Sequence, residues 1–225
     1  MEKFAVIVAG GKGLRMGSAI PKQFLPLAGK PVLYHTINAF KMAFPDIQII
    51  LVLPQDQISM TQMVLQAFPD RIDLTIVAGG ENRFDSVKNG LEAVDEDAIV
   101  FVHDGVRPLV SPELIRACYE QAVEKGSAIP AINVADSMRL TEGEESKPVN
   151  RDHLRIIQTP QTFQSDILLN AFTQDYDPAF TDEATVAEAF GTKVYLINGE
   201  RSNIKVTTPE DLIIAEALLT ARHHA

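Results

Sequence analysis

The sequence predicts an α/β fold built on a single, doubly wound, mostly parallel sheet, and three observations favour it. Apolar runs without polar alternation occur at residues 4–9, 47–53 and 99–102, as expected for parallel strands that are covered on both faces. Between these runs, apolar residues recur at helical spacing. Short polar joints link the segments, so strands and helices alternate along the chain.

Each element of the first half follows from a local pattern. Pro31 stands at a predicted first helical position, and apolar residues at helical spacing follow it. Further helices are expected at 58–68 and 87–94, with a strand at 74–77 between them. Because ligands of such sheets bind beyond the carboxyl ends of the strands, the loops that follow the strands are the predicted site.

The pattern changes after Ala128. Residues 132–140 are expected to be extended, and 141–148 form a polar turn rich in Glu and Gly. We therefore predict a protruding β-arm at about residues 133–150. Isolated two-stranded ribbons are marginal in water, so the arm needs a surface to lie on. A flexible excursion is the alternative.

The last third returns to short helices and strands. Thr208 and Pro209 provide a cap residue and a first-turn proline for a final helix through residue 219. The other expected elements are helices at 164–174 and 181–190 and strands at 193–197 and 204–206. No repeat or separating linker is visible, so residues 1–225 are expected to form one domain.

Composition excludes several classes of function. The 20 Lys and Arg residues stand against 30 Asp and Glu, a net charge of −10, which argues against nucleic-acid and anionic-membrane partners. No apolar run approaches the ~18 residues of a membrane span. Cys118 is the single cysteine, so no intrachain disulfide is possible and a cytoplasmic location is expected. Its helical context predicts a packed apolar residue rather than a nucleophile.

A cationic glycine loop follows the first predicted strand, from Gly10 to Gly17. Glycines expose backbone N–H groups that suit phosphate oxygens, and Lys12, Arg15 and Lys22 add positive charge. The segment predicts a polyphosphate site. It lacks the residue order of a P-loop and the third glycine of a dinucleotide fingerprint. A tight turn with solvated cations is the plainer interpretation of the glycines.

The pattern A-G-G-x-G-x-R-M-G followed by P-K-Q-F, at residues 9–24, resembles the signature of sugar-phosphate nucleotidyltransferases. The P-K-Q-F form is similar to the 2-C-methyl-D-erythritol 4-phosphate cytidylyltransferases of the non-mevalonate isoprenoid pathway. Later blocks match in family order across nearly the whole chain, at residues 79–87, 103–108, 159–161, 181–184 and 203–207. The resemblance implies a Rossmann-like nucleotidyltransferase fold, Mg²⁺ as cofactor, and a homodimer in which the arm embraces the second subunit.

The resemblance also implies roles for individual residues. Arg15 and Lys22 are the expected catalytic residues, because they would stabilise the transition state; Lys12 is a phosphate-binding candidate of lower rank. Asp104 is the expected metal ligand. The expected CTP-binding residues are Ala9, Gly10, Gly11, Gly13, Gly80, Arg83, Ser86, Asp104 and Gly105. The phosphorylated polyol would contact Arg107, Ser137, Arg151, Thr159, Thr181 and Lys205, with Arg151 and Lys205 on its phosphate.

Two positions depart from the family pattern and bear on which acceptor is used. Gly105 and Val106 stand where many members have two alanines, and Ser137 stands where threonine is common. The expected reaction joins CTP to 2-C-methyl-D-erythritol 4-phosphate and releases pyrophosphate. A ribitol 5-phosphate cytidylyltransferase is the nearest alternative.

Alternatives from other classes also remain at this stage. They are a nicotinamide-dependent oxidoreductase and a nucleotide-binding regulatory protein without turnover. Read without the family, Gly79 and Gly80 are a turn and Ser86 starts a helix. His103 is expected to be a packed, hydrogen-bonded neighbour of the site rather than a general base, because nucleotidyl transfer needs no strong base.

Overall fold

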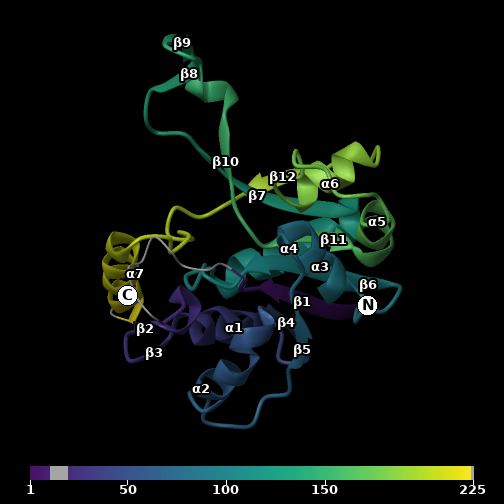
Figure 1. The fold of residues 1–225 in the computed structure, drawn as a ribbon, viewed down its shortest axis with the longest axis vertical. Helices are drawn as coiled ribbons and strands as arrows, with labels where there is room; N and C mark the ends of the chain where they lie inside the picture. Colours follow the sequence, from purple (N-terminus) through teal and green to yellow (C-terminus); the bar gives the residue numbers. More distant parts are fainter. Residues whose placement is uncertain (11–19, 224–225) are drawn as a thin grey trace.

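The structure is a computed structural model that describes residues 1–10 and 20–223. Its centre is an eight-stranded sheet in which seven strands follow the order β10-β7-β11-β6-β1-β4-β5, and β12 pairs with β7 off this path (Figure 1). The strands are β1 (Glu2–Val8), β4 (Gln48–Leu53), β5 (Thr75–Ala78), β6 (Ala98–Asp104), β7 (Ser127–Asn133), β10 (Arg155–Ile157), β11 (Gln161–Gln164) and β12 (Leu196–Asn198).

The centre of the sheet is parallel, as the sequence predicts. β1 pairs in parallel with both β4 and β6, and β5 pairs in parallel with β4. The carboxyl ends of these four strands therefore meet at one edge of the sheet. β11 lies antiparallel to β6 and β7, and the sequence analysis missed it. Its glutamines and threonine are polar, yet Gln161 and Thr162 are buried, so hydropathy does not mark it as an inner strand.

Helices cover both faces of the sheet, which confirms the doubly wound prediction. Ala5 and Ile7 of β1 share a core with α1 (Val32–Ala43) and α4 (Pro112–Lys125). Phe4 and Val6, on the opposite face of β1, share a second core with α3 (Arg83–Leu91), α5 (Ser165–Ala171) and α6 (Glu183–Ala189). A strand between two apolar layers needs apolar residues at every position, which explains the continuous run in β1.

Several boundaries differ from the prediction. Helix α1 begins at Val32, one residue after Pro31, which occupies the N-cap position. The helix expected at 58–68 is a 3₁₀ turn, η3 (Gln55–Met60), followed by the short α2 (Thr61–Leu65). The strand expected at 204–206 is wrong, because this segment has no strand partner along its length. There the Val206 N–H donates to the Val106 carbonyl at 2.8 Å.

The predicted β-arm is present as a hairpin of β8 (Met138–Glu142) and β9 (Glu145–Val149). Its turn is shorter than expected, because Gly143 adopts a φ of 58° that lets the chain reverse at once. In Figure 1 the hairpin stands out from the body at the opposite end from α2. It lies beyond a 3₁₀ turn, η4 (Arg151–His153), and its side chains are almost all exposed.

The remaining elements lie near the carboxyl edge of the sheet. A 3₁₀ turn, η2 (Lys22–Phe24), precedes the small pair β2 (Pro26–Leu27) and β3 (Lys30–Pro31). The last helix, α7 (Pro209–His223), packs its Ala215 into a third core with Leu27 and Val206. Among the described helices, none combines the length and the hydropathy that a bilayer crossing requires.

Candidate functional site

A cavity of about 680 Å³ opens beyond the carboxyl ends of β1, β4, β5 and β6. It is the place where the fold type concentrates loop residues from several strands. Loops after β1, β4 and β5, the end of β6 and the segment before α7 all contribute to its walls. The lining residues are Val8, Ala9, Gly10, Lys22, Pro54, Asp56, Gln57, Gly79, Gly80, Glu81, Asn82, Arg83, Ser86, Asp104, Val106 and Lys205.

Asp104, the last residue of β6, is surrounded by three cations. Its Oδ2 lies 2.9 Å from Lys205 Nζ and 3.5 Å from Arg107 Nε, and its Oδ1 lies 3.4 Å from Arg83 Nη2. Burial would raise the pKa of Asp104, but the charges of Arg83, Lys205 and Arg107 outweigh it and hold the pKa well below its usual range. Asp104 is therefore an anion that ties two arginines and a lysine to one wall of the cavity.

Arg83 is held on its other side by Glu183, the first residue of α6. Arg83 Nη1 lies 2.5 Å from Glu183 Oε1, and Nη2 lies 3.1 Å from Oε2. The Glu183 side chain is fully buried, whereas Arg83 is 31% exposed. Burial raises the pKa of Glu183, and the Arg83 charge offsets part of that rise. This two-pronged pair fixes the plane of the guanidinium group.

His103 and Thr159 form a hydrogen-bond chain beneath Asp104. The Asp104 N–H donates to Thr159 Oγ1 at 3.1 Å, and Thr159 Oγ1 lies 2.9 Å from His103 Nδ1. His103 Nε2 lies 3.3 Å from the Arg107 carbonyl, which can only accept. Burial lowers the pKa of His103 to about 3, so the ring is neutral. These hydrogen bonds require the imidazole proton of His103 to be on Nε2, so Nδ1 accepts from the Thr159 hydroxyl.

The loop after β5 is held by Ser86 at the start of α3. Ser86 Oγ accepts from the Gly80 N–H at 3.1 Å and donates to the Asn82 carbonyl at 2.7 Å. Asn82 caps α3 by accepting from the Asp85 N–H. A Cβ on Gly80 would lie 2.3 Å from Asp85 Cβ, so this turn requires glycine. Ser86 therefore fits both interpretations of its role: it holds the turn at the start of α3, and it lines the cavity.

Lys22 reaches the cavity from η2, and its neighbour Gln23 anchors that turn. Gln23 is fully buried. Its Nε2 donates to the Ala9 carbonyl at 2.8 Å and to Gln57 Oε1 at 2.6 Å. Ala9 in turn donates its N–H to Val52 in β4. Gln23 therefore links the end of β1, η3 and the turn that carries Lys22.

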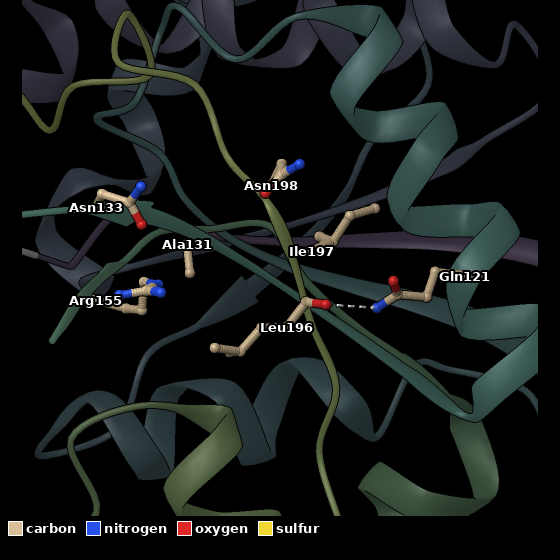
Figure 2. A pocket seen from close by; sticks show the side chains of 7 residues that line it. All are labelled: Gln121, Ala131, Asn133, Arg155, Leu196, Ile197 and Asn198. Carbon is tan, nitrogen blue, oxygen red and sulfur yellow. Dashed lines mark hydrogen bonds between the residues drawn. The ribbon is translucent and has the colours of Figure 1, made fainter. Parts of the chain in front are cut away.

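A second, smaller cavity of about 290 Å³ lies elsewhere, between α4 and strands β7, β10 and β12 (Figure 2). Arg155 is the single charged residue among the seven that line it. The guanidinium group of Arg155 donates to the carbonyls of Asp152 and Leu154. At the other end of the cavity Gln121 donates to the Leu196 carbonyl. Because only one charged side chain lines this smaller cavity, it lacks the cluster of opposite charges found in the larger cavity.

The larger cavity coincides with blocks shared by a known family. The model of the 2-C-methyl-D-erythritol 4-phosphate cytidylyltransferase family matches residues 4–221. The chain belongs to this family. Relatives that bear the same name are 48% identical in Bacteroides thetaiotaomicron and 49% identical in Bacteroides fragilis, each over 97% of this chain and 100% of the relative.

Solved structures agree with the family assignment. The 4-diphosphocytidyl-2C-methyl-D-erythritol synthase of Anaerococcus prevotii superposes with a TM-score of 0.81 at 30% identity, over 97% of this chain and 96% of that one. The 2-C-methyl-D-erythritol 4-phosphate cytidylyltransferase of Thermus thermophilus superposes with a TM-score of 0.78 at 32% identity, over 97% and 98%. The Rossmann-like nucleotidyltransferase fold expected from the family resemblance is confirmed.

The structure gathers many of the predicted site residues around one cavity. Those that line it are Ala9, Gly10, Lys22, Gly80, Arg83, Ser86, Asp104 and Lys205. Gly105 and Arg107 do not line the cavity but contact residues that do: the Gly105 N–H donates to the Val8 carbonyl, and Arg107 pairs with Asp104. A Cβ on Gly105 would lie 2.8 Å from Ala9 Cβ. Gly11, Lys12, Gly13 and Arg15 lie outside the described residues.

Five of the six predicted polyol-binding residues are not in the cavity lining, Arg107 among them. Thr159 is buried, and its hydroxyl belongs to the chain between Asp104 and His103. Thr181 is exposed just before α6. Ser137 and Arg151 lie at the base of the hairpin, where the Arg151 guanidinium donates to the Ala135 carbonyl. The fold of one chain thus leaves the two arm residues outside the cavity.

Two residues of the site escaped the sequence analysis as individual candidates. Glu183 lies in the matched block at residues 181–184, but an acid in a first helical turn is usual. Its burial and its contact with Arg83 depend on tertiary packing. Gln23 lies in the P-K-Q-F block, where a neutral side chain gave no electrostatic signal.

Proposed function

We propose that the chain transfers the cytidylyl group of CTP to 2-C-methyl-D-erythritol 4-phosphate, giving 4-diphosphocytidyl-2-C-methyl-D-erythritol and pyrophosphate. The observation that carries the proposal is a cavity lined by Lys22 and by Asp104 with its partners Arg83 and Lys205, in a chain that matches the family from residue 4 to residue 221. Relatives with 48–49% identity carry the name of this activity. None of these comparisons favours the ribitol 5-phosphate alternative.

The chemistry needs charge stabilisation more than covalent participation by the protein. A phosphate oxygen of the polyol attacks the α-phosphorus, a new P–O bond forms, and the bond to pyrophosphate breaks. Negative charge grows on the non-bridging and leaving oxygens, so cations already fixed in place lower the barrier. Lys22, and Arg15 by family resemblance, would supply this charge. The glycine block at 79–80 with Ser86 would bind the nucleoside, and Lys205 would bind the acceptor phosphate.

Asp104 fits the role of a magnesium ligand in such a site. Mg²⁺ usually binds one or two carboxylates and completes its shell with waters and substrate phosphates. Within the described residues no cluster of three His, Cys, Asp or Glu could hold a metal alone, so phosphates would have to supply further ligands. When bound, Mg²⁺ would neutralise phosphate charge. Lys205, whose side chain is 43% exposed, has room to move from Asp104 toward a phosphate.

The first experiment measures pyrophosphate release from CTP with Mg²⁺ and each polyol phosphate in turn. Turnover with 2-C-methyl-D-erythritol 4-phosphate is expected, and faster turnover with ribitol 5-phosphate would reverse the assignment. Lys22→Ala should lower kcat by on the order of 10²-fold while CTP affinity changes much less. Lys125→Ala, which removes an exposed lysine at the end of α4, is the matched control. Equal losses in kcat and affinity would show that Lys22 only binds CTP.

We further propose that two chains form a cytoplasmic homodimer in which each arm completes the partner's site. The arm exposes Met138 and Leu140, at 40% and 64%, and it carries Ser137 and Arg151 away from its own cavity. Mass determination in solution tests the dimer. If the arms act in trans, mixing Lys22→Ala with Arg151→Ala chains should restore about a quarter of wild-type activity, because a statistical mixture contains that share of intact sites. No recovery after verified exchange would place Arg151 in its own site.

A further inference from the structure

Glu183 and Asp182 are adjacent acids with different surroundings. Asp182 is the N-cap of α6: its Oδ1 accepts from the Thr185 N–H at 2.9 Å, and its Oδ2 accepts from Gln161 Nε2 at 2.9 Å. The first contact caps α6, and the second joins its start to β11. Glu183 instead turns inward, is completely buried, and places both carboxylate oxygens on Arg83. Capping of α6 by Asp182 does not require a second acid at Glu183.

A fully buried carboxylate is costly unless its charge is matched. Arg83 matches it across 100 residues of sequence, and the same guanidinium extends its Nη2 toward Asp104. Burial acts to lower the pKa of Arg83, but the charges of Glu183 and Asp104 outweigh it, so the pKa lies above its ordinary value. Arg83 therefore stays cationic between two carboxylates, one on α6 and one on β6.

This geometry limits how Arg83 can move. Two hydrogen bonds from Nη1 and Nη2 to one carboxylate fix the guanidinium plane, which a single contact would leave free to rotate. Asp104 engages Nη2 at 3.4 Å, at the long end of such contacts, so Glu183 is the stronger of the two restraints. Arg83 is nevertheless part of the cavity wall, next to the Gly79–Gly80 turn.

We propose that Glu183 is a positioning residue for nucleotide binding: it orients Arg83 so that the guanidinium faces both Asp104 and the cavity. The inference rests on the proposed function, because it assumes that the nucleotide occupies this cavity. Glu183 lines no part of the cavity itself, so it acts through Arg83. Loss of the Glu183 charge frees Arg83 to rotate and leaves Asp104 as its one carboxylate partner among the described contacts.

The test compares Glu183→Gln with Asp182→Asn, which removes the same charge from the neighbouring residue and keeps a good N-cap. Glu183→Gln should lower kcat/KM for CTP by on the order of 10-fold, with a smaller change in KM for the polyol phosphate. Asp182→Asn should leave both constants within about twofold of wild type. A Glu183→Gln protein with a lower Tm but unchanged kinetic constants would overturn the proposal, because its role would then be structural.

A double-mutant cycle with Arg83→Gln tests whether Glu183 acts through Arg83. Adding Glu183→Gln to Arg83→Gln should cause little further loss in kcat/KM, whereas independent, multiplying losses would contradict the inference. If Glu183→Gln does not fold, Glu183→Asp keeps the charge but shortens its reach, and a weakened CTP affinity is still expected.

CTP affinity by calorimetry separates the two proposals. A wild-type protein that binds CTP without turnover would refute the proposed function alone, and unchanged CTP affinity in the Glu183 variants would refute this inference alone.

Discussion

His103 is expected to make the folded state lose stability as the pH falls from 7 to 5. The imidazole is fully buried, and its pKa of about 3 compares with 6.5 for an unperturbed histidine. In this interval the unfolded chain binds the proton and the folded chain does not. Stability is therefore fully present above pH 6.5 and is lost progressively as the pH falls toward 3.

The size of the effect follows from the two pKa values. Proton linkage gives a loss of about 2 kcal/mol in the free energy of unfolding between pH 7 and pH 5. The charges that face the ring act in both directions, because Asp104 raises its pKa and Arg107 and Arg83 lower it. Burial is the larger cause. The ring also packs edge-on against Phe40, with centroids 5.2 Å apart, which keeps water away from it.

The assay is urea unfolding of the wild type and His103→Gln across this pH range. The substitution itself changes the free energy of unfolding by an amount that does not depend on pH. The informative quantity is therefore how the difference in this free energy between the two proteins changes with pH. We expect that difference to shrink by about 2 kcal/mol from pH 7 to pH 5. NMR titration of the histidine rings provides a second measurement on the wild type. Parallel pH profiles, or a His103 ring that titrates near pH 6.5, would refute the reasoning.

Three further predictions concern single residues. Burial raises the pKa of Cys118 to about 12, so a thiol reagent at pH 8 should leave the folded protein unlabelled; rapid labelling before denaturation would contradict this. Gly80→Ala should cost about 1–3 kcal/mol, measured by thermal unfolding, because the new Cβ meets Asp85. The control is Gly10→Ala, where no described atom lies within 4 Å, and an equal loss there would rule out the clash. Lys205→Met should lower kcat/KM for the polyol phosphate about 10-fold or more, with little change for CTP; equal loss for both substrates would argue against an acceptor-side role.

Much of the fold could be predicted because its signals are local. From Phe4 to Val8 the first strand is apolar at every position, and this pattern alone predicts a strand covered on both faces. Thr208 and Pro209 marked the start of α7 by their capping chemistry. β11 had no such signal, since buried Gln161 is satisfied by Asp182 and Ala184, which lie about twenty residues away in the sequence. A buried polar strand can be recognised only with its partners in place.

The candidate site divides in the same way. Lys22, Gly80 and Asp104 followed predicted strands or matched family blocks, and strand ends of a parallel sheet necessarily meet at one edge. The position of Thr159 was not predictable. Its residue type suits substrate binding, yet tertiary packing placed its hydroxyl between Asp104 and His103.

The sequence by itself determined the alternating strands and helices, the glycine turns and the family, because apolar spacing, backbone freedom and motif order are properties of neighbouring residues. Only the tertiary structure decided that Glu183 lies buried against Arg83 and that Asp104 holds three cations. The physical reason is that a charge's partner is set by how α3, α6 and β6 pack, and 100 residues separate Arg83 from Glu183. Patterns among neighbouring residues cannot indicate a contact between two residues that lie so far apart in the sequence.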